Sequence, residues 1–209
     1  MTKLSEVVKG FLREHFQLAV LVLLFFIVGS ILGGISVTHL HQEQQTALKN
    51  YLDQNFQLLA DQPVNRITVV GQTVLGNLKI GISLWFLGLT VIGLPLIGLI
   101  ILVRGFILGF TTGFLIQQKS LQGAVLIILG IIPQNLIYIP FLLLGGVLSI
   151  SFSLYLIRGR ISVARTMWTR FFSYSLSMFL IIIGLIIAGL IEGLVAPAFL
   201  RLLIPVISS

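Results

Sequence analysis

The sequence contains no cysteine and few charged residues. The absence of cysteine excludes disulfides, zinc–thiolate sites, iron–sulfur clusters and thiol nucleophiles. Charged residues make up 9% of the 209 residues and hydrophobic residues 57%, whereas a soluble domain has about 25% charged and about 45–50% apolar residues. A disordered chain is also excluded, because it requires low hydrophobicity. The composition therefore indicates a protein whose main solvent is lipid.

Long uncharged runs divide the chain into expected membrane spans. One crossing needs about 20 apolar residues, each adding about 1.5 Å to a helix. The first run is longer than the core of a cleaved signal peptide, so we interpret it as a retained span. We expect an all-α, polytopic helical membrane protein, one integral membrane domain over 1–209 with about five crossings, at 18–37, 80–103, 105–132, 136–157 and 174–195.

The segment 105–132 is too long for one untilted crossing, because a straight helix of that length measures about 42 Å. A polar block at 117–120 interrupts it. Two interpretations are compatible with this pattern: a broken or tilted crossing, and a re-entrant hairpin that turns at the polar block. The positions of the later basic residues favour one net crossing.

Basic residues set the expected orientation. The formal charge of +7 comes from 13 Lys and Arg against 6 Asp and Glu. Basic residues of membrane proteins collect on the cytoplasmic side, so the excess does not indicate a nucleic-acid partner. We therefore expect a cytoplasmic N-terminus, which places these basic residues inside: Lys3, Lys9, Arg13, Arg104, Arg158, Arg160, Arg165 and Arg170.

Residues 38–79 form the longest polar stretch, and we expect them outside the membrane. Within this stretch, 41–60 has apolar residues at a spacing of three to four, which predicts an amphipathic helix. Its apolar stripe must be covered by the bilayer surface, by the rest of the bundle or by an outside partner. The stripe, a candidate partner-binding surface, consists of Leu48, Tyr51, Leu52, Phe56 and Leu59.

The polar residues do not predict an enzyme. The three histidines, His15, His39 and His41, lie outside the expected spans, and the sequence has no His-Glu-x-x-His metal motif. Glu192 is the one carboxylate in an expected span, so paired acid–base chemistry has no candidates. We expect no catalytic residue, no metal and no cofactor.

A few polar residues at membrane depth remain as candidates for another role. Glu192 is a candidate for proton or ion coupling, but it lies near a helix end, where it can reach the headgroups and pair with Arg201. Pro133-Gln134-Asn135 is compatible with a broken helix that binds a substrate; we favour a polar turn at the outer surface. Lys119 belongs to the polar block at 117–120.

Glycines recur at a spacing of four residues, which lets helix backbones approach closely. Such contacts occur within a chain or between chains, so a homodimer stays open. The glycines concerned are Gly29 and Gly33, Gly105, Gly109 and Gly113, and Gly189 and Gly193.

The order of these motifs resembles the stage II sporulation protein M family of endospore-forming bacteria. The likeness rests on Gly93-Leu94-Pro95, the Gly-Phe pairs that begin at 105, 109 and 113, Pro133-Gln134-Asn135, and Ser151-Phe152-Ser153. The Pro-Gln-Asn motif is the most specific of these. The resemblance covers most of the chain.

The resemblance implies a membrane scaffold without catalytic activity in the bacterial cytoplasmic membrane, at the septum or in the mother-cell membrane of a sporulating cell. It implies that the chain recruits sporulation proteins D and P, which remodel peptidoglycan, for septal wall thinning and engulfment. Apart from the resemblance, two alternatives remain: a small transporter or channel subunit that uses Glu192, Lys119 and the Pro133 break, and a permease-like partner of a cytoplasmic ATPase that docks through 158–170.

Overall fold

The computed structural model describes residues 15–61, 66–157 and 164–207, and every regular element in these ranges is a helix. Five helices are long and apolar enough to cross a membrane, which confirms the expected class of helical membrane protein. The elements are α2 (Phe16–Thr38), α3 (Gln42–Asp61), α4 (Arg66–Gly88), α5 (Gly93–Leu126), the π-helical turn η1 (Ile127–Ile131), α6 (Ile132–Ile157) and α7 (Ala164–Ile207).

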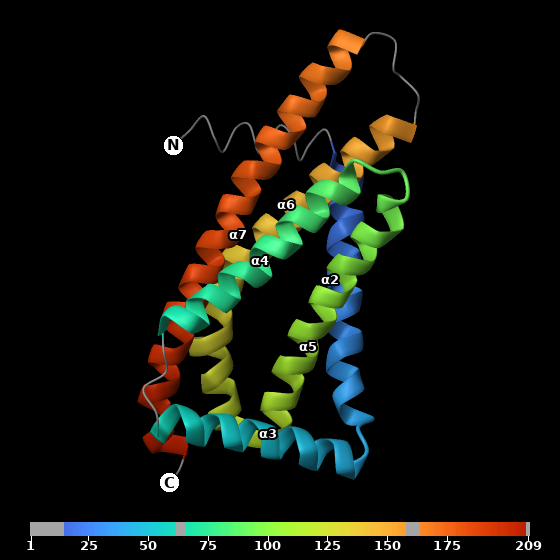
Figure 1. Ribbon diagram of the computed structural model, residues 1–209. Helices are drawn as coiled ribbons and strands as arrows, with labels where there is room; N and C mark the ends of the chain where they lie inside the picture. Colours follow the sequence, from blue (N-terminus) through green and yellow to red (C-terminus); the bar gives the residue numbers. More distant parts are fainter. Residues whose placement is uncertain (1–14, 62–65, 158–163, 208–209) are drawn as a thin grey trace.

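The long helices form two groups (Figure 1). α2 and α5 run side by side, and α4, α6 and α7 pack together beside them. α3 lies across one end of both groups and contacts α7. The amphipathic helix expected at 41–60 is therefore present as α3, and it forms a platform at one end of the bundle.

α2 and α5 pack backbone against backbone. A Cβ atom at Gly29 or Gly33 would collide with backbone carbonyls of α5, and a Cβ atom at Gly105 or Gly109 would collide with backbone carbonyls of α2. The Ser30 hydroxyl donates a hydrogen bond of 3.1 Å to the carbonyl of Gly105. Lipid provides no hydrophobic drive for helix association, so close contact of this kind is what holds two spans together.

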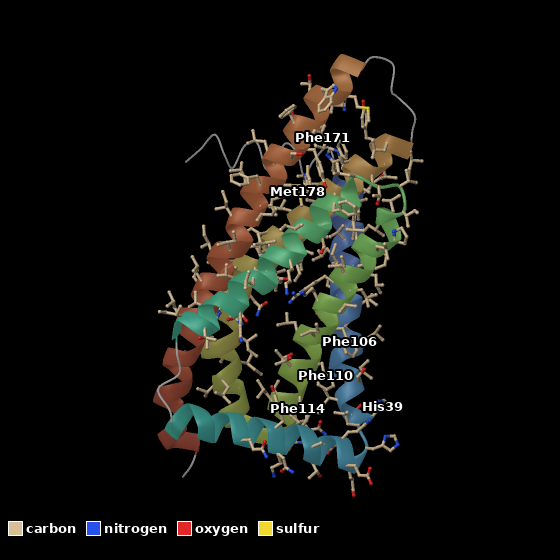
Figure 2. The ribbon with its side chains drawn as sticks, viewed as in Figure 1. His39, Phe106, Phe110, Phe114, Phe171 and Met178 are labelled. Atoms are coloured by element: carbon tan, nitrogen blue, oxygen red, sulfur yellow. The ribbon has the colours of Figure 1, made fainter. Side chains whose placement is uncertain are left out.

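The phenylalanines that follow these glycines have a different partner. Phe106, Phe110 and Phe114 stack on one another along α5, with ring centroids 6.1 and 6.2 Å apart, and Figure 2 shows them in a row down this helix. Each residue at a spacing of four lies one turn further along the same face. The Gly-Phe repeat therefore produces a smooth face toward α2 and a continuous aromatic row beside it.

The chain turns at 89–92, in the middle of the span expected at 80–103, so that span is wrong. α4 ends at Gly88 and α5 begins at Gly93, and the candidate crossings on either side are Ile67–Gly88 and Gly93–Gln118. Pro95 lies in the first turn of α5, where the missing N–H has no helical partner to lose. It does not kink a span.

Hydrogen bonds from α6 and α7 hold this turn. The Tyr174 hydroxyl donates to the carbonyl of Trp85 at 2.8 Å, and the Ser153 hydroxyl donates to the carbonyl of Thr90 at 2.7 Å. The Phe152 ring stacks on Tyr174 with centroids 4.3 Å apart. These contacts satisfy carbonyls at the end of α4 that lipid cannot hydrogen-bond, and they place part of the Ser-Phe-Ser motif at the turn.

The chain reverses a second time within the bounds of α5, between Gln118 and Gly123. The segment 105–132 is therefore not one interrupted crossing, and the reversal lies at the polar block, where the hairpin interpretation expected a turn. A Cβ atom at Gly123 would collide with the backbone carbonyl of Leu115, eight residues earlier, although eight residues span about 12 Å in a straight helix. The candidate crossings therefore end at Gln118 and resume at Gly123. The segment contains the second half of one crossing and the beginning of the next, so five crossings remain.

We predict that a Gly109→Ala substitution destabilises the fold. The added methyl group would collide with the backbone carbonyl of Ser30 and push α2 away from α5, at a cost of about 1–3 kcal/mol. The measurement is thermal unfolding of the purified protein in detergent.

The matched control is Gly71→Ala in α4, because a Cβ atom there has no neighbour within 4 Å. Its stability should be unchanged or higher by up to about 1 kcal/mol, since alanine favours a helix over glycine. Equal stability of the two variants would contradict the proposed packing.

Candidate functional site

Polar side chains of four helices meet around one cavity of about 230 Å³ between the two helix groups. The cavity is bounded by α4, α5, the junction of η1 with α6, and α7. Its lining contains one positive and one negative side chain, together with several uncharged polar ones. These residues are Asn77, Arg104, Thr111, Gln134, Asn135, Tyr138 and Glu192.

The cavity lies near the middle of the spans. Asn77 is 11 residues before the end of α4 at Gly88, and Arg104 is 11 residues after the start of α5 at Gly93. Eleven residues of helix measure about 16 Å, which is half of a hydrocarbon core of about 30 Å. Polar side chains at this depth are costly in a membrane protein and usually functional.

Arg104 was expected on the cytoplasmic side, at the end of the span 80–103, and this prediction is wrong, because Arg104 lies inside α5. Its guanidinium lies over the Tyr138 ring, 5.6 Å from the ring centroid, and it lines the same cavity as Glu192. The sequence pattern predicted the end of a span at Arg104, because a single arginine after a long apolar run is typical of such an end. The turn at 89–92, which has no polar cluster, moves Arg104 into the next crossing.

Glu192 lines the same cavity from α7 and is partly buried there. The structure thus places Glu192 in one cavity with Arg104, whereas the sequence suggested Arg201 as its partner. The side chain of Arg201 lies outside the described residues. Glu192 and Arg104 together give the cavity balanced charge.

Pro133-Gln134-Asn135 is not a turn at the surface, as we expected, but part of the first turn of α6. The π-helical turn η1 precedes it, and such turns often occur at functional sites. The Asn135 side-chain amide donates to the carbonyl of Ile131 at 2.9 Å. Among the described side chains, the Gln134 Oε1 and Tyr138 hydroxyl oxygens are buried without a hydrogen-bond partner.

Close contact of α7 with α4 forms the wall beside Asn77. A Cβ atom at Gly193 would lie 2.6 Å from the Cα of Val70, and the contact at Gly189 is also tight. The Asn77 side-chain amide donates to the carbonyl of Leu185 at 3.2 Å. The two glycines thus allow α7 to pack closely against α4 within one chain. The glycines of α2 and α5 allow the same close packing between those two helices.

The described candidates on α3 do not line the cavity. On α3, Leu48 is half-buried and Tyr51 is 67% exposed; the side chains of Leu52, Phe56, Leu59 and Lys119 lie outside the described residues. His39 lies at the exposed corner between α2 and α3 (Figure 2). In the part of the chain that the structure describes, no group of three or more histidine or carboxylate side chains can hold a metal ion.

Comparison with known proteins identifies one family. The family model described as stage II sporulation protein M matches residues 22–197, which is most of the chain. No curated protein matches the sequence. No solved structure matches the fold.

We predict that Arg104 and Glu192 are energetically coupled. Either single substitution, Arg104→Gln or Glu192→Gln, leaves the other charge in the cavity without a charge of opposite sign, which should destabilise the fold. The double variant should be more stable than the sum of the two losses predicts, by about 0.5–3 kcal/mol. Thermal unfolding of all four proteins in detergent measures this coupling, and strictly additive losses would exclude it.

Proposed function

This chain belongs to the stage II sporulation protein M family, and from that premise we propose that it is a membrane scaffold without catalytic activity. In this proposal it recruits the peptidoglycan-remodelling sporulation proteins D and P to the membrane in which it lies. The complex then thins septal wall during engulfment. The scaffold acts by position: it holds soluble or single-span partners at one membrane face.

The observation that carries this proposal is the placement of α3. Its 20 residues lie across one end of the bundle instead of crossing the membrane. Exposed side chains along the helix include Glu43, Lys49, Asn50 and Tyr51, which together offer charge, an amide and an aromatic ring. Such a polar platform at the membrane surface presents hydrogen-bonding groups and an aromatic ring to a protein partner.

The chemistry of the described residues agrees with a scaffold. The polar cavity contains one carboxylate, Glu192, and no histidine, so it has neither a paired acid and base nor a nucleophile with its base. The cavity is also separated from the aqueous face by about half the membrane thickness, whereas peptidoglycan lies outside the membrane. Remodelling of the wall is therefore assigned to the partners.

The cavity favours a second candidate function, the binding or movement of a small polar ligand within the membrane. Two of the groups singled out for a transporter, Glu192 and the segment after Pro133, line this one cavity with Arg104. A transporter would also need access to the cavity from both membrane faces. The scaffold remains our main proposal, because it uses the platform that the fold builds outside the spans.

The proposal requires α3 on the outer side of the membrane, and we predict that it is accessible there. Since the chain has no cysteine, single variants can be labelled without background. Asn50→Cys on α3 should react with a membrane-impermeant maleimide in intact cells, whereas Trp168→Cys near the other end of the bundle should react only after lysis. If only position 168 were labelled in intact cells, the orientation would be the reverse of the proposed one.

We predict that replacing α3 removes partner capture. A glycine–serine linker of the same 20 residues has a root-mean-square length of about 25 Å, close to the roughly 30 Å of the helix, so it can still connect α2 to α4. Co-purification with proteins D and P from detergent should fall to background. If the variant captured as much partner as the unaltered protein, α3 would not be the docking surface.

Trp168→Ala is the matched control for this experiment. Trp168 is also a large exposed aromatic side chain, but it lies in α7 at the end of the bundle opposite α3. Capture should be unchanged in this variant. Loss of capture in both variants would indicate general damage and not a docking role of α3.

A further inference from the structure

The wall of the polar cavity at mid-depth is not fully hydrogen-bonded. Among the described side chains, the Gln134 Oε1 and Tyr138 hydroxyl oxygens are buried without a partner, and both residues line the cavity. Inside a membrane, such a group costs free energy for as long as it lacks a partner. A volume of about 230 Å³ is room for roughly seven water molecules at about 30 Å³ each, or for one small polar group.

The charges of the cavity select the kind of group. A lone anion would be attracted by Arg104 and repelled by Glu192. A lone cation would be attracted by Glu192 and repelled by Arg104. A zwitterion satisfies both, because a phosphate matches the planar donors of the guanidinium and an ammonium group matches the carboxylate.

An apolar groove adjoins the cavity. It has a volume of about 450 Å³ and an almost entirely apolar lining contributed by α2, α5, η1 and α6. It shares Leu108, Ile131 and Asn135 with the cavity. On its α6 side, Ile132 and Leu136 are exposed, so that the groove faces the lipid. A polar cavity next to a lipid-facing groove is the arrangement that an amphiphile requires.

We propose that the cavity and groove together bind one zwitterionic phospholipid. The phosphate of its headgroup pairs with Arg104 and its ammonium group with Glu192, while an acyl chain lies in the groove along α6. This site goes beyond the scaffold role, and it differs from the general contact of the helices with the bilayer. It requires the headgroup at mid-depth, between the two helix groups.

The test is native mass spectrometry of the purified full-length protein in detergent with equal amounts of phosphatidylethanolamine and phosphatidylglycerol. The protein should retain the zwitterionic lipid over the anionic one. Arg104→Gln should reduce retention of both lipids about tenfold, because each phosphate then loses one charge-assisted hydrogen bond. Glu192→Gln should abolish the preference between them, since the anionic lipid then meets no repulsion. Equal retention of the two lipids by the unaltered protein would overturn the proposal.

Two further variants test the groove. Ile139→Trp adds bulk to its lining and should reduce lipid retention, whereas Leu180→Trp, at an exposed position of α7 that does not line it, should not. If the two substitutions reduced retention equally, the groove would not be the binding site of an acyl chain. If free glycerophosphoethanolamine displaced the lipid at equal concentration, the ligand would be a soluble zwitterion and the assignment to a lipid would be wrong.

Size-exclusion chromatography establishes which variants are folded. If Arg104→Gln does not fold, the nearly isosteric Glu192→Gln decides the question, because an unchanged lipid preference in the folded variant would exclude the proposed headgroup pairing. Retention of neither lipid by the unaltered protein would leave water as the content of the cavity and overturn the proposal. None of these readouts involves proteins D and P, so they are independent of the scaffold role.

Discussion

Contact between bare backbones is the constraint on which the rest of this fold depends. Glycines of α2 and α5 place each helix against the carbonyls of the other, and Gly189 and Gly193 place α7 against the backbone of α4 at Val74 and Val70. In lipid, where apolar side chains gain nothing by leaving the solvent, this closeness supplies the dispersion contacts that hold helices together. The distance between the helices of each pair, α2 with α5 and α4 with α7, can consequently change little.

The cavity follows from this arrangement. Where the pair of α2 and α5 meets the group of α4, α6 and α7, the contacts are made by larger side chains and the backbones stay apart. The π-helical turn and Pro133 interrupt the regular helical hydrogen bonds at the same place. The polar side chains of Gln134 and Asn135 therefore occur where the backbone itself leaves groups unsatisfied, and Arg104 and Glu192 occupy the space beside them.

The sequence determined the class of fold, the platform helix and the glycine faces, because each depends on a local pattern of apolar or small residues. It missed the turn at 89–92 for a physical reason, whereas the polar block at 117–120 marks the second reversal. Residues 89–92 are Leu-Thr-Val-Ile, which fit an apolar span equally well, and the hydrogen bonds from Ser153 and Tyr174 that hold this turn come from distant helices. The cavity was hidden by the same error, since Arg104 enters a span only when the turn is correctly placed. Glu192 and the Pro-Gln-Asn segment were recognised singly, but their convergence is a property of helix packing.

A docking platform alone does not account for the interior of this protein. A scaffold needs helices that hold α3 in place, and the glycine contacts and the hydrogen-bonded turn already provide this. A guanidinium, a carboxylate and two unpaired polar oxygens at mid-depth add nothing to that task, and they carry a desolvation cost that an apolar interior of equal volume would avoid. Their positions on four helices, around one volume, link α4, α5, α6 and α7 at a point far from α3. The platform and the cavity are thus separate features of one bundle, and the cavity must be explained by what it contains.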